Sequence, residues 1–152
     1  MRKFILTIVA ALMCIASYAQ NVKNSTADSI LGKYESVQGG DAYKVQVTRN
    51  SNGSYRAQIF WVADDKDPKT GAKRLDEKNP DKSLRSLPCD KVVLFDGLVY
   101  DSAKKCWNGT KIYDPQRGIR ANVTCTFLSD GRLSLKGTVL GISETAYWTE
   151  IK

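Results

Sequence analysis

Acidic side chains are the residues of this chain that come nearest to a catalytic constellation. The 152 residues include no histidine, which excludes Ser-His-Asp and Cys-His nucleophilic schemes and histidine-ligated zinc. Asp76 and Asp81 lie in one charged segment, and Asp114 follows Tyr113. Two carboxylates held across a cleft could hydrolyse a glycosidic bond, which is the catalytic alternative. Because lysines such as Lys78 are interspersed with these acids, a solvated mixed-charge loop is the simpler interpretation, and we expect no enzymatic activity.

The same acids do not form a convincing metal site. Asp65, Asp67 and Asp76 have the first, third and twelfth spacing of a calcium loop, but Lys69 occupies a ligand position and Thr70 replaces the required glycine. The glycines of the sequence show no phosphate-binding pattern. We therefore expect neither a metal nor a cofactor.

The first 19 residues have the organisation of a signal peptide. Arg2 and Lys3 provide a positive start, residues 4–15 are uncharged and almost wholly apolar, and Ser17 and Ala19 fit a cleavage site. The run is shorter than the roughly 20 apolar residues of a membrane-spanning helix, so no transmembrane anchor is expected. We predict an exported protein, periplasmic or secreted after cleavage near Ala19.

The charge of the chain is positive but dispersed. The formal net charge is +7, of which Arg2 and Lys3 account for two units. The other basic residues are scattered along the chain, whereas a nucleic-acid site needs them clustered on one face. We therefore expect no nucleic-acid partner, and no pattern specifies an oligomeric state.

Three cysteines remain after the predicted cleavage. Cys125 shares the apolar parity of its strand, so it is expected in the core. Cys89 and Cys106 lie at strand edges beside loops, and an oxidising compartment would permit them to form a disulfide. The sequence thus suggests a Cys89–Cys106 bridge, and three buried thiols are the alternative.

Beyond a polar, disordered lead-in over residues 20–29, the chain has the pattern of an antiparallel β protein. From Tyr55 to Trp61 every second residue is expected on one apolar face, and the turn residues Asn50–Gly53 precede this strand, which predicts a hairpin. Residues 30–152 are expected to form one domain, a barrel or a sandwich. The expected strands cover residues 30–37, 43–48, 54–62, 91–95, 97–100, 107–113, 119–128, 132–140 and 143–151.

One long segment, residues 63–88, interrupts these strands and has no period of two. Within it, residues 79–85 have the form of a short helix that Asn79 could cap. We expect Leu84 to point into the barrel and Arg85 to pair with Asp114. A long loop of this kind is often functional, as a lid for example.

Four motifs resemble the domain-of-unknown-function family DUF2147. They are Asp76–Arg85, Gly109–Pro115, Leu133–Gly137 and the pair Trp148-Thr149, in that order over nearly all of the chain beyond the signal peptide. The resemblance implies a relation to the calycins, the superfamily of lipocalins and fatty-acid-binding proteins. It therefore implies an antiparallel up-and-down barrel, here of eight to ten strands, with one long loop carrying a short helix.

The aromatic residues of such a barrel either fill its interior or line a cavity, and the sequence leaves both open. The leading hypothesis is a binding protein for a small apolar or amphipathic ligand. The alternative is a filled structural barrel that acts as an envelope protein-interaction module. The candidate ligand-binding residues come from the aromatic strands and the two polar motifs: Tyr55, Trp61, Asp76, Asn79, Arg85, Tyr113, Asp114 and Trp148.

Overall fold

A computed structural model of the protein describes residues 22–38 and 40–152, so the predicted signal peptide lies outside the described residues. Within the described part, no helix is long and apolar enough to cross a membrane. The elements are β1 (Gly32–Gln38), β2 (Asp41–Arg49), β3 (Tyr55–Val62), β4 (Val93–Asp101), β5 (Cys106–Asn108), β6 (Lys111–Asp114), β7 (Ile119–Phe127), β8 (Leu133–Val139) and β9 (Ile142–Glu150), with 3-10 turns η1 (Lys23–Ser25), η2 (Ala27–Ile30), η3 (Lys82–Leu84) and η4 (Cys89–Lys91).

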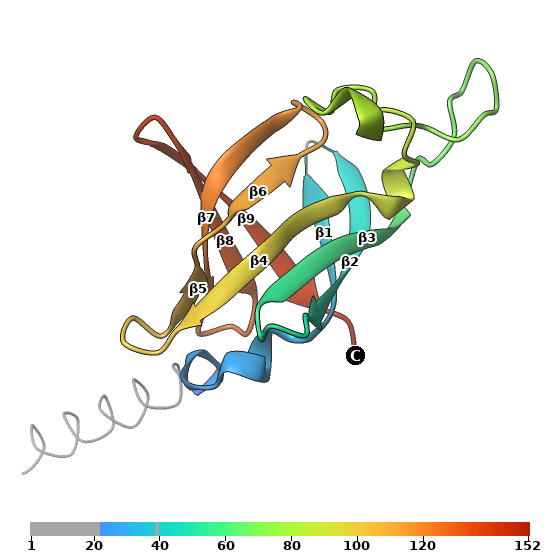
Figure 1. Ribbon diagram of the computed structural model, residues 1–152. Coiled ribbons are helices and arrows are strands. Elements are labelled where there is room, and N and C mark those ends of the chain that lie inside the picture. The colour runs from blue at the N-terminus through green and yellow to red at the C-terminus, as the bar shows by residue number, and fades with distance from the viewer. Residues whose placement is uncertain (1–21, 39) are drawn as a thin grey trace, which may run out of the picture.

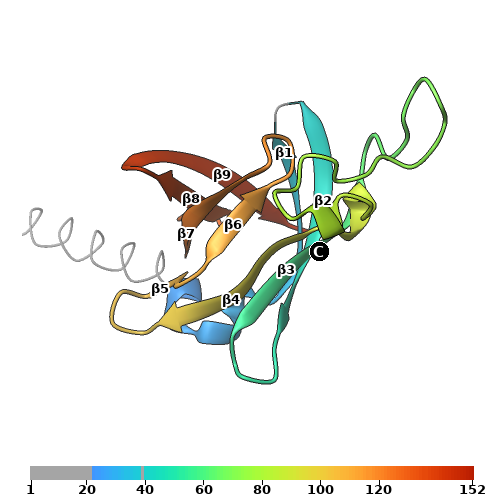
Figure 2. The ribbon, with the colours of Figure 1, turned by 45° about the horizontal axis from the view of Figure 1, so that its top comes forward.

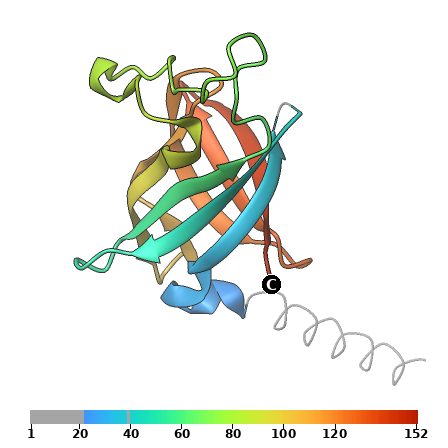
Figure 3. The same ribbon diagram turned by 90° about the vertical axis from the view of Figure 1, so that its right-hand side faces the viewer.

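The strands form an antiparallel barrel, as the family resemblance implies. The sheet order is β5-β4-β3-β2-β1-β9-β8-β7-β6, and a further pairing between β5 and β7 closes it. Eight strands thus make the closed wall, and β6 is an additional strand that continues along β7 beyond β5 (Figure 1). A view from the side shows the segment 63–88 over one end of this barrel (Figure 3). Closure leaves few unpaired edges, which suits a small β protein.

The turn residues of the β2–β3 hairpin set its register, but a β-bulge shifts that register farther along the strands. Gly53 takes a φ of 86° in the turn, and its amide donates to the Asn50 carbonyl at 3.0 Å. Lys44 pairs with Trp61 but Val45 pairs with Ile59, so a β-bulge shifts the register. A bulge reverses the alternation of side chains. Trp61 is therefore 42 % exposed, with Lys44 Nζ 5.0 Å from its ring centroid, and the expected inward position is wrong.

Aromatic side chains fill much of the barrel interior. Trp107 and Trp148 are both fully buried, and Phe95 stacks on Trp148 with ring centroids 6.0 Å apart. Phe127 meets the Trp107 ring edge to face at 5.7 Å. The predicted core position of Cys125 is also confirmed, since its side chain is fully buried. The core is thus packed around a few large rings.

The expected disordered lead-in over residues 20–29 is wrong where the structure describes it. Turns η1 and η2 cover the end of the barrel opposite the segment 63–88 (Figures 1 and 3). Asn24 is buried, donates to the Phe127 carbonyl at 3.0 Å and accepts the Phe127 amide at 2.8 Å. Asp28 accepts the Tyr55 hydroxyl at 2.7 Å. Polar residues without period order this segment because they satisfy strand-end groups, which no local pattern reveals.

The Tyr55–Asp28 contact makes stability sensitive to alkaline pH. Burial raises the pKa of Tyr55 to about 12, and the hydrogen bond to Asp28 and the Asp28 charge add to the shift. The pKa of a tyrosine in an unfolded chain is about 10. Because the folded state holds the Tyr55 proton more tightly than the unfolded state, the contact stabilises the protein fully below about pH 10. This stabilisation is lost as the pH rises through 12.

We therefore expect urea unfolding of the wild type to show a falling free energy above pH 10. The Tyr55→Phe variant should fall less steeply over the same range. Tyr147→Phe, at a 43 % exposed ring, is the matched control and should follow the wild type. Equal slopes for the wild type and the Tyr55 variant would contradict the prediction.

The expected Cys89–Cys106 disulfide is wrong, because all three described cysteines are free thiols. Cys89 begins η4, just before β4, whereas Cys106 pairs with Asp101 at the far end of β4. Nine strand residues span roughly 26 Å, and a disulfide needs Cα atoms within about 7 Å. Edge position alone could not distinguish the two ends of one strand.

Candidate functional site

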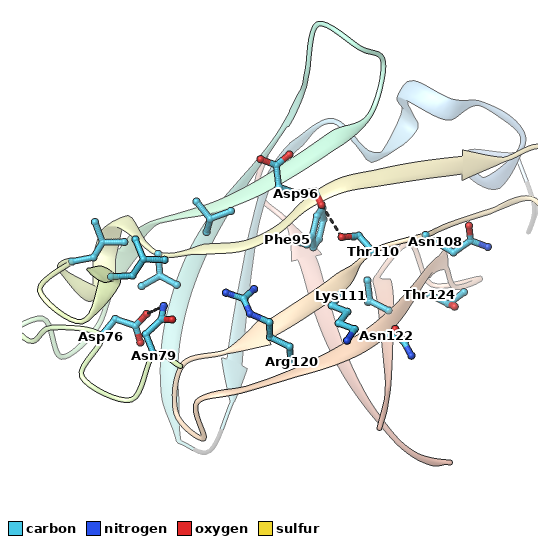
Figure 4. Close-up of a pocket in the computed structure, with 16 residues that line it drawn as sticks. Asp76, Asn79, Phe95, Asp96, Asn108, Thr110, Lys111, Arg120, Asn122 and Thr124 are labelled. Atoms are coloured by element: carbon cyan, nitrogen blue, oxygen red, sulfur yellow. Dashed lines mark hydrogen bonds between the residues drawn. The ribbon is translucent and has the colours of Figure 1, made fainter. Parts of the chain in front are cut away.

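A pocket opens in the barrel wall where β4 and β6 diverge. β4 pairs with β5 only at Val99–Asp101, while β6 pairs with β7, so the earlier part of β4 has no strand partner on that side. Figure 2 shows the two strands close together near β5 and spread apart toward the segment 63–88. The Thr110 hydroxyl donates to the Asp96 carbonyl at 2.7 Å and bridges the two sides (Figure 4). The pocket volume is about 810 Å³. It is in the range of small-molecule sites, roughly 300–1,000 Å³.

The pocket has an apolar back and a polar rim. Val92, Phe95 and Val123 are buried side chains that form the back, and Leu87 of the segment 63–88 adds to it. Leu84 is 38 % exposed at the edge. The polar residues come from β4, from the β5–β6 ribbon, from β7 and from the segment 63–88: Asp76, Asn79, Asp96, Asn108, Thr110, Lys111, Arg120, Asn122 and Thr124.

One end of the pocket is closed by a buried polar lock, which we define as Asp76, Asn79 and Tyr113. The Asp76 carboxylate accepts the Tyr113 hydroxyl at 2.7 Å and the Asn79 side-chain amide at 2.7 Å. All three side chains are 2 % exposed. Burial, followed by the hydrogen bond to Asp76, raises the pKa of Tyr113, so the hydroxyl stays protonated and donates. The lock ties the segment 63–88 to β6.

A close backbone contact stands beside the lock. Gly118, in the turn after β6, has a φ of 66°, and a Cβ built on it would lie 2.3 Å from the Lys78 carbonyl oxygen. The Lys78 ammonium donates to the Gln116 carbonyl at 2.8 Å. The motif of residues 76–85 and the motif of residues 109–115 therefore meet through the Asp76–Tyr113 hydrogen bond, with the turn after β6 packed beside it.

The expected helix over residues 79–85 is shorter and differently capped. Only η3, Lys82–Leu84, is helical, and Asp81 caps it by accepting the Ser83 amide at 2.9 Å. Asn79 does not cap this helix, because its side chain donates to Asp76 and accepts the Asp81 amide at 2.9 Å. Leu84 lines the pocket edge and is not buried in the barrel, which corrects the expected inward position.

The expected Arg85–Asp114 ion pair is also wrong. Arg85 donates through Nε to the Asn79 carbonyl at 2.8 Å. Asp114 pairs instead with Arg117 at 2.7 Å, and Arg117 also contacts Glu144. The short turn after β6 brings Arg117 back over Asp114, so the local partner takes the carboxylate.

The remaining candidates lie away from the pocket. Tyr55 is at the opposite end of the barrel, and Trp61 lies on the outside. Trp148 is in the core, where its indole donates to the Tyr43 hydroxyl at 2.8 Å and its ring supports Phe95. Of the eight candidate residues, the pocket therefore includes Asp76 and Asn79, with Tyr113 beside them in the lock.

Two basic residues of the pocket, Lys111 and Arg120, were not among the residues nominated from the sequence. Arg120 is paired across the ladder with Tyr113, and Lys111 with Asn122. The alternation of Arg120, Asn122 and Thr124 marks one polar face of β7, and the Tyr113 motif marks its neighbour. If the turn between these two segments is taken as a hairpin turn, their polar faces lie side by side, and this pairing identifies the residues of the rim. In the described part of the chain, no group of acidic, histidine or cysteine side chains could hold a metal ion.

Comparisons with known proteins agree with this barrel. The model of a family described as "Uncharacterized protein conserved in bacteria (DUF2147)" matches residues 32–150. No curated protein sequence matches the chain. A similar solved structure is described as "Protein HP1028 from the human pathogen Helicobacter pylori belongs to the lipocalin family". It has 21 % sequence identity and a TM-score of 0.64, over 81 % of this chain and 83 % of the other.

Proposed function

We propose a function from the pocket itself, on the premise that this chain belongs to the DUF2147 family of uncharacterised bacterial proteins with a lipocalin-like barrel. The protein binds a small amphipathic molecule between β4 and the β6–β7 ribbon. Its apolar part contacts Phe95, Val92 and Val123, and its polar part lies at the rim. The segment 63–88, held by the lock, forms one end of the site.

The observation that carries this proposal is a pocket in the barrel wall with core apolar side chains at its back and polar side chains at its rim. Phe95 and Val123 belong to the core, yet they also line the pocket that the divergence of β4 from β6 opens in the wall. A concave pocket with an apolar back and a few polar groups at its rim is typical of small-molecule sites. The ring stack behind Phe95 fills the barrel axis, so the ligand occupies the side pocket and not the centre.

We also propose that the protein acts outside the cytoplasm, on the signal-peptide pattern of residues 1–19. The intact mass of protein recovered from fractionated bacterial cells tests this. A mass that begins at Gln20 in the envelope or medium supports export, and an uncut chain in the cytoplasm opposes it.

Leu84 tests the ligand site with little risk to the fold, because it is 38 % exposed at the pocket edge. We expect Leu84→Ser to weaken the binding of a neutral apolar probe, N-phenylnaphthylamine, by about three- to tenfold, since the variant loses apolar contact. Fluorescence titration of the chain from residue 20 measures the dissociation constant.

Leu140→Ser is the matched control, because Leu140 is 97 % exposed on the β8–β9 turn and does not line the pocket. It should bind the probe as the wild type does. If neither the probe nor dodecanol binds the wild type, the binding proposal fails. The filled interior then favours the alternative of a structural barrel that acts through its surface.

A further inference from the structure

Two cations stand on the polar rim of the pocket, on neighbouring strands. Lys111 projects from β6 and Arg120 from β7 (Figure 4). The Arg120 guanidinium carbon lies 5.0 Å from the centroid of the Tyr113 ring, a cation–π arrangement. Since the lock fixes Tyr113 from its other end, the guanidinium rests on an ordered platform.

The carboxylates of the pocket do not neutralise these cations. Asp76 is occupied by the lock. Asp96 accepts the Asn50 side-chain amide at 2.7 Å and approaches Arg56 at 4.0 Å, and Figure 4 shows its carboxylate turned away from Arg120.

Among residues 22–38 and 40–152, no carboxylate oxygen lies within 4.0 Å of the Arg120 or Lys111 side-chain nitrogens. Asp81 senses Arg120 only from a distance. Its pKa is lowered first by hydrogen bonds from Ser83, and the Arg120 charge adds a smaller contribution. Arg117, by contrast, contacts both Asp114 and Glu144. The pocket rim therefore carries positive charge beside an apolar back.

We infer that the ligand is an anionic amphiphile whose carboxylate or phosphate head binds Arg120, with Lys111 in support, while its tail covers Phe95 and Val123. This rests on the proposed function and specifies its ligand class. A guanidinium presents two parallel N–H groups to a carboxylate or phosphate, and a nearby ammonium adds attraction without fixed geometry. Burying the tail alone would not require either cation.

Probes with the same tail and different heads separate the two ideas. Dodecanol, dodecanoate, dodecyl phosphate and dodecyltrimethylammonium, each below its micelle concentration, displace N-phenylnaphthylamine from the wild-type chain. We expect dodecanoate or dodecyl phosphate to bind at least tenfold more tightly than dodecanol, and the trimethylammonium probe to bind most weakly. The preference should shrink in high salt, because solvent-exposed charges are screened. The order of dodecanoate and dodecyl phosphate identifies the head group.

Substitutions assign the effect to residues. Arg120→Gln should abolish the preference for the anionic heads over dodecanol. Arg120→Lys should retain part of this preference, and Lys111→Gln should reduce it about threefold. Lys33→Gln is the matched control, since Lys33 is exposed on β1, a strand that does not line the pocket. Thermal unfolding of each variant checks that the fold is kept.

The outcomes separate the two proposals. Binding of dodecanol and dodecanoate with equal affinity, unchanged in Arg120→Gln, overturns the anionic-head inference and leaves the binding proposal standing. Absence of binding by every probe overturns both. An equal loss in Lys33→Gln shows a general effect of net charge and also overturns the assignment to Arg120.

Discussion

Replacing Gly118 with alanine is expected to destabilise the protein by about 3 kcal/mol and to loosen the segment 63–88. The added Cβ would lie 2.3 Å from the Lys78 carbonyl oxygen, a backbone atom that cannot rotate away. The residue would also be held at a φ of 66°, which costs an L-residue roughly 1–2 kcal/mol. Urea unfolding measures the loss of stability, and trypsin cleavage after Lys82 measures the loosening.

Gly131→Ala separates the two contributions. Gly131 has a φ of 89°, but a Cβ there would meet no atom within 4 Å. It should therefore cost only the backbone strain, about 1 kcal/mol, and leave trypsin cleavage after Lys82 unchanged. Equal costs for the two variants would show that the turn after β6 and the segment 63–88 are not in contact in solution.

The strands could be predicted because the residues that form them carry their own signals. The Asn50–Gly53 turn and the alternation after it specify the β2–β3 hairpin, and the parity of Cys125 specifies its burial. The bulge at Lys44 could not be predicted, because it arises from the packing of two strands and not from either one. Its consequence, the outward Trp61, follows from the same cause.

The candidate site was predictable only in part, for a related reason. The lock joins two recognisable motifs, so Asp76, Asn79 and Tyr113 were found. The pocket depends on where β4 leaves the ladder, which requires the closed barrel. Arg120 becomes a pocket residue only through that divergence, and in the sequence it is one dispersed basic residue among many.

Replacing Asp76 with alanine is expected to cost about 3–5 kcal/mol, the largest effect that we predict for one residue of the site. Its removal leaves the Tyr113 hydroxyl and the Asn79 amide buried without their acceptor, and each such group costs about 1–3 kcal/mol. Asp81→Ala is the control in the same segment. It removes only the cap of η3, so its cost should be about 0.5–1 kcal/mol.

A double-mutant cycle with Tyr113→Phe tests whether the lock is the cause. Tyr113→Phe alone removes one donor to Asp76 and should cost about 1–2 kcal/mol. In the double variant no hydroxyl is left to satisfy, so the cost should be smaller than the sum of the single costs by at least about 1 kcal/mol. Urea unfolding at neutral pH supplies the four free energies. Simple additivity would mean that the Asp76–Tyr113 hydrogen bond does not stabilise the folded state.

The same cycle separates the stability of the lock from its effect on the ligand. Tyr113→Phe keeps the ring beneath Arg120 and removes only the hydroxyl, so the preference for dodecanoate over dodecanol should survive at reduced stability. Asp76→Ala releases the whole ring and the segment 63–88, so the preference should fall together with stability. If both variants lose stability but only Asp76→Ala loses the head-group preference, the lock contributes to binding by holding the Tyr113 ring in place.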